Sequence, residues 1–126
     1  MKLVQVNAIT FVFLLLCGVG SGCSKSSGPP PALPVEQLPT AFGKTFKQAK
    51  PEIKNLADAV VASVQTNGYA SAYTWLQNLS AQSGLTREQA SLAARALVTI
   101  NGLANAAAAK GDESAAQAVK TYRSQK

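Results

Sequence analysis

The sequence predicts an all-α fold, a small antiparallel bundle of about four helices over residues 40–126. Apolar residues recur there in steps of three or four, which is the spacing of one helix face. No segment of this region alternates apolar and polar residues between turn signals, as half-buried strands do. Short connections that contain glycine separate the periodic segments, which favours antiparallel neighbours, and the many alanines allow helix backbones to approach closely.

The first periodic segment begins near Thr40 and keeps its phase as far as Val64. Its apolar stripe consists of Phe42, Phe46, Ala49, Ile53, Leu56, Val60 and Val64. Pro51 lies inside this segment, and a proline in a helix interior removes a backbone hydrogen bond and clashes with the preceding turn. We therefore expect either a kink at Pro51 or a new helix that has Pro51 in its first turn. Asn67 and Gly68 then supply the left-handed backbone that commonly ends a helix.

A second helix is predicted over residues 69–81, with Gly84 beyond its end. Its inward residues are Tyr69, Ala72, Tyr73, Leu76 and Leu79. Tyr69 and Tyr73 share the inward stripe, whereas Trp75 falls at its edge. Because tyrosine and tryptophan are enriched at the centres of protein interfaces, these three aromatic residues are candidates for contact with a partner. The alternative is that they fill volume in an alanine-rich core.

Two cap signals predict a third and a fourth helix. Thr86 is a predicted N-cap, and Gln89 three positions later completes a capping box. The stripe of this third helix consists of Leu92, Ala93, Ala96, Leu97, Ile100, Leu103, Ala104 and Ala107, and Gly111 ends it. Asp112 is the predicted cap of a fourth, shorter helix. Its inward residues are Ala115, Ala118, Val119 and Tyr122.

The first predicted hairpin resembles the turn and second helix of a tetratricopeptide repeat. The resemblance is carried by the run Asn67-Gly68-Tyr69-Ala70-Ser71-Ala72, followed by Leu76 and Leu79. A second turn, Lys110-Gly111-Asp112 with Ala116, begins in the same way, with Glu113 at the aromatic position. The two glycines are 43 residues apart (111 − 68), against a period of about 34 residues in that family. The resemblance implies tetratricopeptide-like helical hairpins, and such repeats usually bind other proteins in a concave groove.

Residues 1–22 have the layout of an export signal. Lys2 precedes an apolar run over residues 8–19, which is shorter than the about 20 apolar residues that a membrane span needs. The following residues resemble the lipobox of bacterial lipoproteins, in which a leucine and two small residues precede a cysteine. The matching residues here are Gly20, Ser21, Gly22 and Cys23. The resemblance implies cleavage before Cys23 and acylation of its thiol; the alternative is an ordinary secretory signal and a secreted soluble protein.

Residues 23–39 are predicted to form the lipidated cysteine and a proline- and serine-rich tether. Proline favours extended polyproline II geometry, so this stretch is expected to be semi-rigid. Two or three acyl chains would anchor the protein firmly, since each buried CH₂ contributes about 0.8 kcal/mol. In lipoproteins of Gram-negative bacteria an aspartate after the cysteine commonly signals retention in the inner membrane. Ser24 stands there instead, so the resemblance favours the periplasmic face of the outer membrane.

The chain is basic, with twelve Lys and Arg against six Asp and Glu and a formal net charge of +6. This balance favours anionic lipid head groups or another acidic surface. Four lysines are predicted to project from the first helix on the side away from its apolar stripe, and they are candidates for contact with an anionic surface: Lys44, Lys47, Lys50 and Lys54. A solvated helix face is the alternative. Nucleic acid is not expected as a partner, because the basic residues accompany no binding motif.

The residue types that usually carry catalysis are scarce. The chain has no histidine, which removes the commonest general base and the commonest metal ligand, so we expect no metal and no cofactor. Three glutamates lie in predicted first turns, where they complement the helix dipole, and Asp112 is a predicted cap. Of the acidic residues in the predicted helical domain, only Asp58 has no predicted structural role. No hydroxyl nucleophile has a base beside it in a known motif, so we do not expect an enzyme.

Together these patterns predict an exported, lipid-anchored protein of the cell envelope. Its helical domain is expected to act as a non-catalytic interaction or scaffold module with a protein partner. The alternative is a periplasmic carrier that holds a small apolar ligand or a lipid between its helices.

Overall fold

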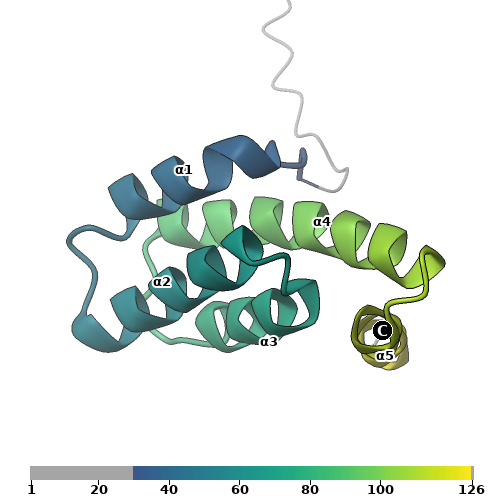
Figure 1. Ribbon diagram of the computed structural model, residues 1–126. Helices are drawn as coiled ribbons and strands as arrows, with labels where there is room; N and C mark the ends of the chain where they lie inside the picture. Colours follow the sequence, from purple (N-terminus) through teal and green to yellow (C-terminus); the bar gives the residue numbers. More distant parts are fainter. Residues whose placement is uncertain (1–29, 126) are drawn as a thin grey trace, which may run out of the picture.

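The computed structural model describes residues 30–125, and this part of the chain has five α-helices and no strand (Figure 1). The elements are η1 (Val35–Gln37), a 3₁₀ helix, followed by α1 (Leu38–Thr45), α2 (Pro51–Gln65), α3 (Tyr69–Ser80), α4 (Arg87–Ala109) and α5 (Glu113–Ser124). The all-α prediction is therefore confirmed. The predicted export signal over residues 1–22 and the predicted acylation site at Cys23 lie outside the described residues.

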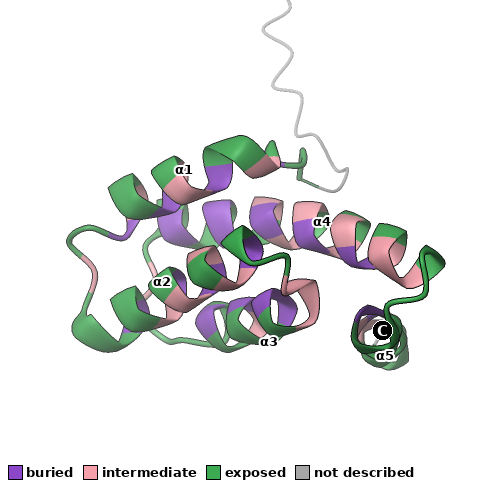
Figure 2. Cartoon of the chain, viewed as in Figure 1, coloured by how far each residue is buried: buried purple, intermediate pink, exposed green. Residues whose placement is uncertain are grey.

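Helices that follow one another in the chain pack against one another, and α3 and α4 each contact three other helices. Helix α4 contacts α1, α3 and α5, while α2 packs on α3 and α1 (Figure 1). The buried positions turn toward the space between the helices (Figure 2). The largest fully buried side chains are those of Leu38, Phe42, Phe46, Val60, Leu76, Leu79 and Ile100. Among the described residues, one large core joins the segment around Leu33 to helices α1 to α4, and a second, small cluster of Ala104, Ala115 and Val119 joins α4 to α5.

Pro51 begins a new helix rather than bending a long one. It is the first residue of α2, where a proline costs no intrahelical hydrogen bond. The residue before a proline avoids helical backbone, and Lys50 is accordingly extended, with φ −56° and ψ 149°. The segment from Phe46 to Lys50 is therefore a connection, although Phe46 remains fully buried against Phe42 with ring centroids 5.2 Å apart. The prediction of about four helices becomes five for this reason.

The folded part begins earlier than residue 40. Leu33 is 4% exposed and Leu38 is fully buried, although both were assigned to the tether. Two polar contacts fasten the backbone around Leu33 to α4: the Thr99 hydroxyl donates to the Leu33 carbonyl, and Arg95 Nε donates to the Pro31 carbonyl over 3.2 Å. We call residues 30–34 the strap. The C-terminal part of the predicted tether thus packs on the helices and does not stand away from them.

The predicted caps of α4 and α5 are confirmed. The Gln89 backbone N–H donates to the Thr86 hydroxyl over 3.1 Å, and the Gln89 side chain accepts from the Thr86 backbone N–H over 3.0 Å. The Ala115 backbone N–H donates to Asp112 Oδ1 over 2.9 Å. These bonds satisfy N–H groups that a helix start leaves without intrahelical partners.

By length and composition, α4 is the one helix among the described residues that is long and apolar enough to cross a membrane. It has 23 residues, and an 18-residue window within it has a mean hydropathy of 1.2. Its buried residues are Gln89, Leu92, Ala93, Ala96, Ile100 and Ala104, and they pack into the core. Contacts with α1, α3 and α5 account for the apolar character of that inner face.

Candidate functional site

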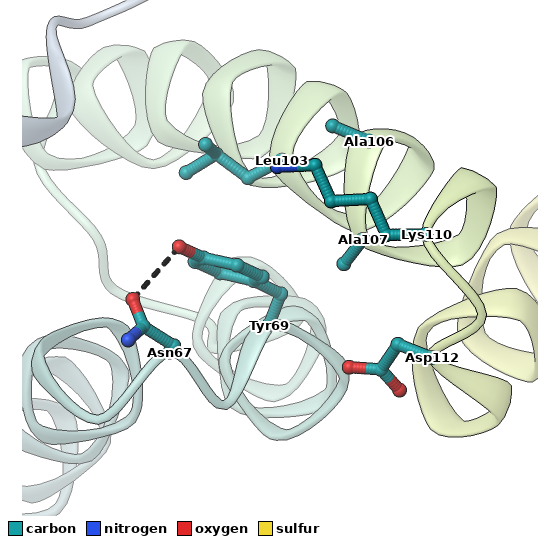
Figure 3. Close-up of a pocket in the computed structure, with 7 residues that line it drawn as sticks. All are labelled: Asn67, Tyr69, Leu103, Ala106, Ala107, Lys110 and Asp112. Carbon is teal, nitrogen blue, oxygen red and sulfur yellow. Dashed lines mark hydrogen bonds between the residues drawn. The ribbon is translucent and has the colours of Figure 1, made fainter.

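A cleft of about 340 Å³ opens between the α2–α3 turn and the C-terminal end of α4. Its lining comes from the α2–α3 turn, the last turns of α4 and the residue that caps α5 (Figure 3). The lining residues are Asn67, Tyr69, Leu103, Ala106, Ala107, Lys110 and Asp112. The cleft thus joins two turns that are far apart in the sequence.

The α2–α3 turn is held by a closed pattern of backbone hydrogen bonds. The Asn67 N–H donates to the Val64 carbonyl over 3.0 Å, and the Gly68 N–H donates to the Ser63 carbonyl over 2.8 Å. This is the Schellman arrangement, which needs a left-handed residue directly after the helix. Asn67 supplies it with φ 57°, whereas Gly68 has φ −79°. The predicted left-handed backbone is therefore confirmed at Asn67 and not at Gly68.

The α4–α5 turn repeats the same arrangement. The Gly111 N–H donates to the Ala108 carbonyl over 3.0 Å, and the Asp112 N–H donates to the Ala107 carbonyl over 3.1 Å. Gly111 is the left-handed residue here, with φ 97°. Because both turns are fixed by their own backbone, the side chains of Asn67 and Asp112 are presented to the cleft from rigid positions (Figure 3).

Tyr69 forms the wall of the cleft opposite α4. Its ring is half-buried and packs against a small apolar cluster that joins α4 to α5. The buried members of this cluster are Ala104, Ala115 and Val119. The Tyr69 hydroxyl donates to Asn67 Oδ1 over 2.9 Å, so the phenol is fixed at both ends (Figure 3).

The rim of the cleft carries groups of both charges. The Lys110 side chain runs along α4 toward Leu103, so that its methylene groups lie over the alanines of that helix (Figure 3). The Asp112 carboxylate lies across the opening while its Oδ1 caps α5. An apolar floor with an ammonium, a carboxylate and an amide at its edge suits one apolar side chain of a partner together with the polar backbone beside it.

The described residues offer no grouping that is suited to metal binding, because nowhere do three His, Cys, Asp or Glu side chains come together. Asp58, which had no predicted structural role, forms an ion pair with Lys54 on the surface of α2. Lys54 Nζ donates a hydrogen bond to Asp58 Oδ2 over 2.7 Å. The structure therefore gives Asp58 a local partner.

Of the three predicted contact aromatics, only Tyr69 lines this cleft. Tyr73 is 4% exposed and belongs to the core, where its ring meets that of Tyr122 edge to face at 5.7 Å. Gln77 Nε2 donates to the Tyr73 hydroxyl over 2.6 Å. Burial raises the pKa of Tyr73 above its usual value, and the neighbouring Tyr122 adds to the rise. Tyr73 thus serves the alternative role, filling volume in the core.

Trp75 is 40% exposed on α3. It follows Tyr69 by six positions, which turns a helix by about 240° at 3.6 residues per turn. Trp75 therefore projects from a different side of α3 than the cleft, and the two aromatic residues do not form one surface.

The four predicted surface lysines do not project from one helix. Lys44 belongs to α1, Lys47 and Lys50 lie in the connection before Pro51, and Lys54 belongs to α2. All four are exposed. The expectation that they share a helix face is wrong, because the helix ends at Thr45.

Several cleft residues were not singled out as site residues from the sequence. Asn67, Lys110 and Asp112 were recognised only as turn or cap residues, and Leu103 was assigned to the inner stripe. The signal that marks them is the repeated turn, a glycine-containing connection followed by a helix start. That signal predicts two turns and does not predict that they face one cleft.

Comparisons of the chain with protein-family models, with curated proteins and with solved structures find no match. Function is therefore inferred from the residues and their geometry.

Proposed function

We propose that this chain is an exported protein of the cell envelope, acylated at Cys23, whose helices form a non-catalytic interaction module. The observation that carries the interaction role is the cleft beside Tyr69, which has an apolar floor and a polar rim. The export signal and the lipobox-like residues 20–23 support the location, at the periplasmic face of the outer membrane.

The dimensions of the cleft favour a protein partner. A volume of about 340 Å³ lies at the small end of ligand pockets and suits a single large side chain. A half-buried tyrosine fixed by a hydrogen bond gives a partner a rigid apolar surface, at little cost in conformational entropy. We further propose that the α2–α3 and α4–α5 turns belong to tetratricopeptide-like hairpins, as the run from Asn67 to Ala72 suggests.

The carrier alternative is less well supported. A carrier of a lipid encloses its ligand and removes most of the ligand surface from water. The cleft at Tyr69 is open to solvent, and the largest buried side chains pack together in one core. A protein partner that inserts one side chain needs no enclosed volume.

The location is tested by intact-mass measurement of the mature protein purified from membranes. Cleavage before Cys23 and the added mass of two or three acyl chains are expected. A mature chain that lacks acyl groups and stays in the soluble fraction would contradict the lipid anchor.

The interaction role is tested by photocrosslinking in intact cells from a photoreactive residue placed at Lys110. We expect a specific protein adduct that is lost in Ala106→Trp, because the indole ring would fill the cleft. Ala90→Trp is the matched control, since Ala90 is also an exposed alanine of α4 and lies outside the cleft. Adducts that persist in Ala106→Trp would show that the cleft is not the contact site.

A further inference from the structure

Apart from Arg95, which donates to the strap, the outward side of α4 beside the strap carries no charged residue. The sequence has no charged residue between Arg95 and Lys110, although α4 presents exposed positions over this whole stretch. A helix face in water normally carries charged residues, so this one is unusually apolar. The exposed residues of this face are Ala94, Val98 and Gly102, and Val98 is 38% exposed. We call these three residues the outer face of α4.

The strap extends this apolar surface. Two hollows flank Val98, one of about 270 Å³ that includes Pro30 and one of about 520 Å³ that includes Ala32 and Pro34. Glu36 is the single charged residue among the residues that line them. Val98, which is exposed between these two hollows, is a candidate for contact with a membrane or with another protein.

The position of the acylated cysteine decides between these occupants. Cys23 precedes Pro30 by seven residues (30 − 23), and a fully extended chain covers about 3.5 Å per residue, so the two lie within about 25 Å of each other. Pro30 itself lines one of the hollows beside Val98. The strap is fastened to α4 through Arg95 and Thr99. The chain that leads to Cys23 therefore leaves the folded part at the edge of this apolar surface.

We propose that the outer face of α4 and the strap dock on the phospholipid bilayer that holds the acyl chains of Cys23. The proposal rests on the lipid anchor of the proposed function. A short tether gives the docking surface a high effective concentration at the bilayer, so that even a small apolar contact is occupied. Leu103 borders both a hollow beside Val98 and the cleft at Tyr69, so a partner in the cleft lies close to the bilayer surface.

The test uses the full acylated protein, reconstituted in vesicles of phosphatidylethanolamine and phosphatidylglycerol. Single thiols are introduced as Val98→Cys and, for comparison, Asn78→Cys. Asn78 is exposed on α3, which lies across α4 from the strap (Figure 1). Because acylation occupies Cys23 and cleavage removes Cys17, an environment-sensitive dye labels only the introduced thiol.

We expect the dye at residue 98 to shift its emission to the blue on reconstitution. Brominated lipids should quench it several-fold more strongly than the dye at residue 78. In a second pair, a dye at Ala94→Cys should lose this quenching when Gly102→Glu is added and keep it when Asn78→Glu is added. Both glutamates occupy exposed sites, and circular dichroism confirms that each variant is folded.

Flotation with the vesicles and intact mass report the anchor separately from docking. Protein that floats but whose dye at residue 98 is quenched no more than the dye at residue 78 would overturn docking and leave the anchor intact. Protein that neither floats nor carries acyl chains would overturn both proposals. Disulfide formation between two copies at residue 98, without quenching by lipid, would assign the surface to a second copy and overturn the bilayer as its occupant.

Discussion

The hydroxyl of Tyr69 donates a hydrogen bond to Oδ1 of Asn67 over 2.9 Å, which joins the first residue of α3 to the left-handed residue that ends α2. Left-handed backbone costs most L-residues about 1–2 kcal/mol, and asparagine and glycine tolerate it best. Asn67 therefore ends α2 through its backbone conformation, and its side chain fixes the Tyr69 phenol that lines the cleft.

Two substitutions at Asn67 separate these two roles. Asn67→Gly keeps the left-handed turn and removes only the acceptor for Tyr69. Asn67→Ala removes the acceptor and also strains the backbone, so we expect its free energy of unfolding to be about 1 kcal/mol lower than that of Asn67→Gly. Urea denaturation followed by helix circular dichroism measures the difference. Equal free energies of unfolding for Asn67→Gly and Asn67→Ala would mean that the turn relaxes in the alanine variant and that left-handed backbone at this position has no energetic cost.

The strap is expected to contribute to stability. Leu33→Ala removes a buried leucine and should lower the free energy of unfolding by about 2–3 kcal/mol. Ala32→Ser is the control, because Ala32 is exposed, and its effect should stay within about 0.5 kcal/mol. Urea denaturation compares the two variants with the unchanged protein. If Leu33→Ala and Ala32→Ser have the same free energy of unfolding, the strap does not contribute to the stability of the helices.

Features that depend on neighbouring residues could be predicted from the sequence. The capping box of Thr86 and Gln89 involves two residues three positions apart, and both of its hydrogen bonds are present. The inward stripes were likewise predicted from the helical period alone. Pro51 left two outcomes open, because a stripe that keeps its phase is compatible with both a kinked helix and two separate helices.

Features that depend on distant residues could not be predicted. The strap has no helical period because it is rich in proline, and its partner Thr99 lies 66 residues away from Leu33. The cleft joins Asn67 to Asp112, two residues that local patterns identify only as a turn and a cap. Packing decides which turns face each other, and a single sequence carries no local signal for it.

The stability of the protein should fall at alkaline pH through Tyr73. Burial raises the pKa of Tyr73 above 10.0, and Tyr122 raises it further. A group with a higher pKa in the folded state stabilises that state fully below the unfolded pKa, and this contribution is lost as the pH rises through the folded pKa. In Tyr73→Phe the urea midpoint should therefore fall less between about pH 9 and about pH 11 than in the unchanged protein. The two proteins differ only in the phenol hydroxyl at residue 73, so the comparison isolates Tyr73. If the urea midpoint falls by the same amount in Tyr73→Phe and in the unchanged protein, Tyr73 is not the source of the loss of stability.

Tyr73 and Trp75 are two positions apart on α3, and truncation should destabilise the protein much more at Tyr73 than at Trp75. Tyr73→Ala removes a buried ring that packs on Tyr122, and it should cost about 3–5 kcal/mol of unfolding free energy. Trp75→Ala removes a ring that is 40% exposed, and a cost of about 1 kcal/mol or less is expected. Thermal denaturation measures both effects.

The Trp75→Ala variant also distinguishes the cleft from the exposed face of α3 as the place of partner contact. Because Trp75 projects from another side of α3 than Tyr69, crosslinks from Lys110 should keep their yield in Trp75→Ala. Loss of those crosslinks in a Trp75→Ala protein with an unchanged thermal midpoint would place the indole in the interface, and the partner would then have to cover α3 as well as the cleft.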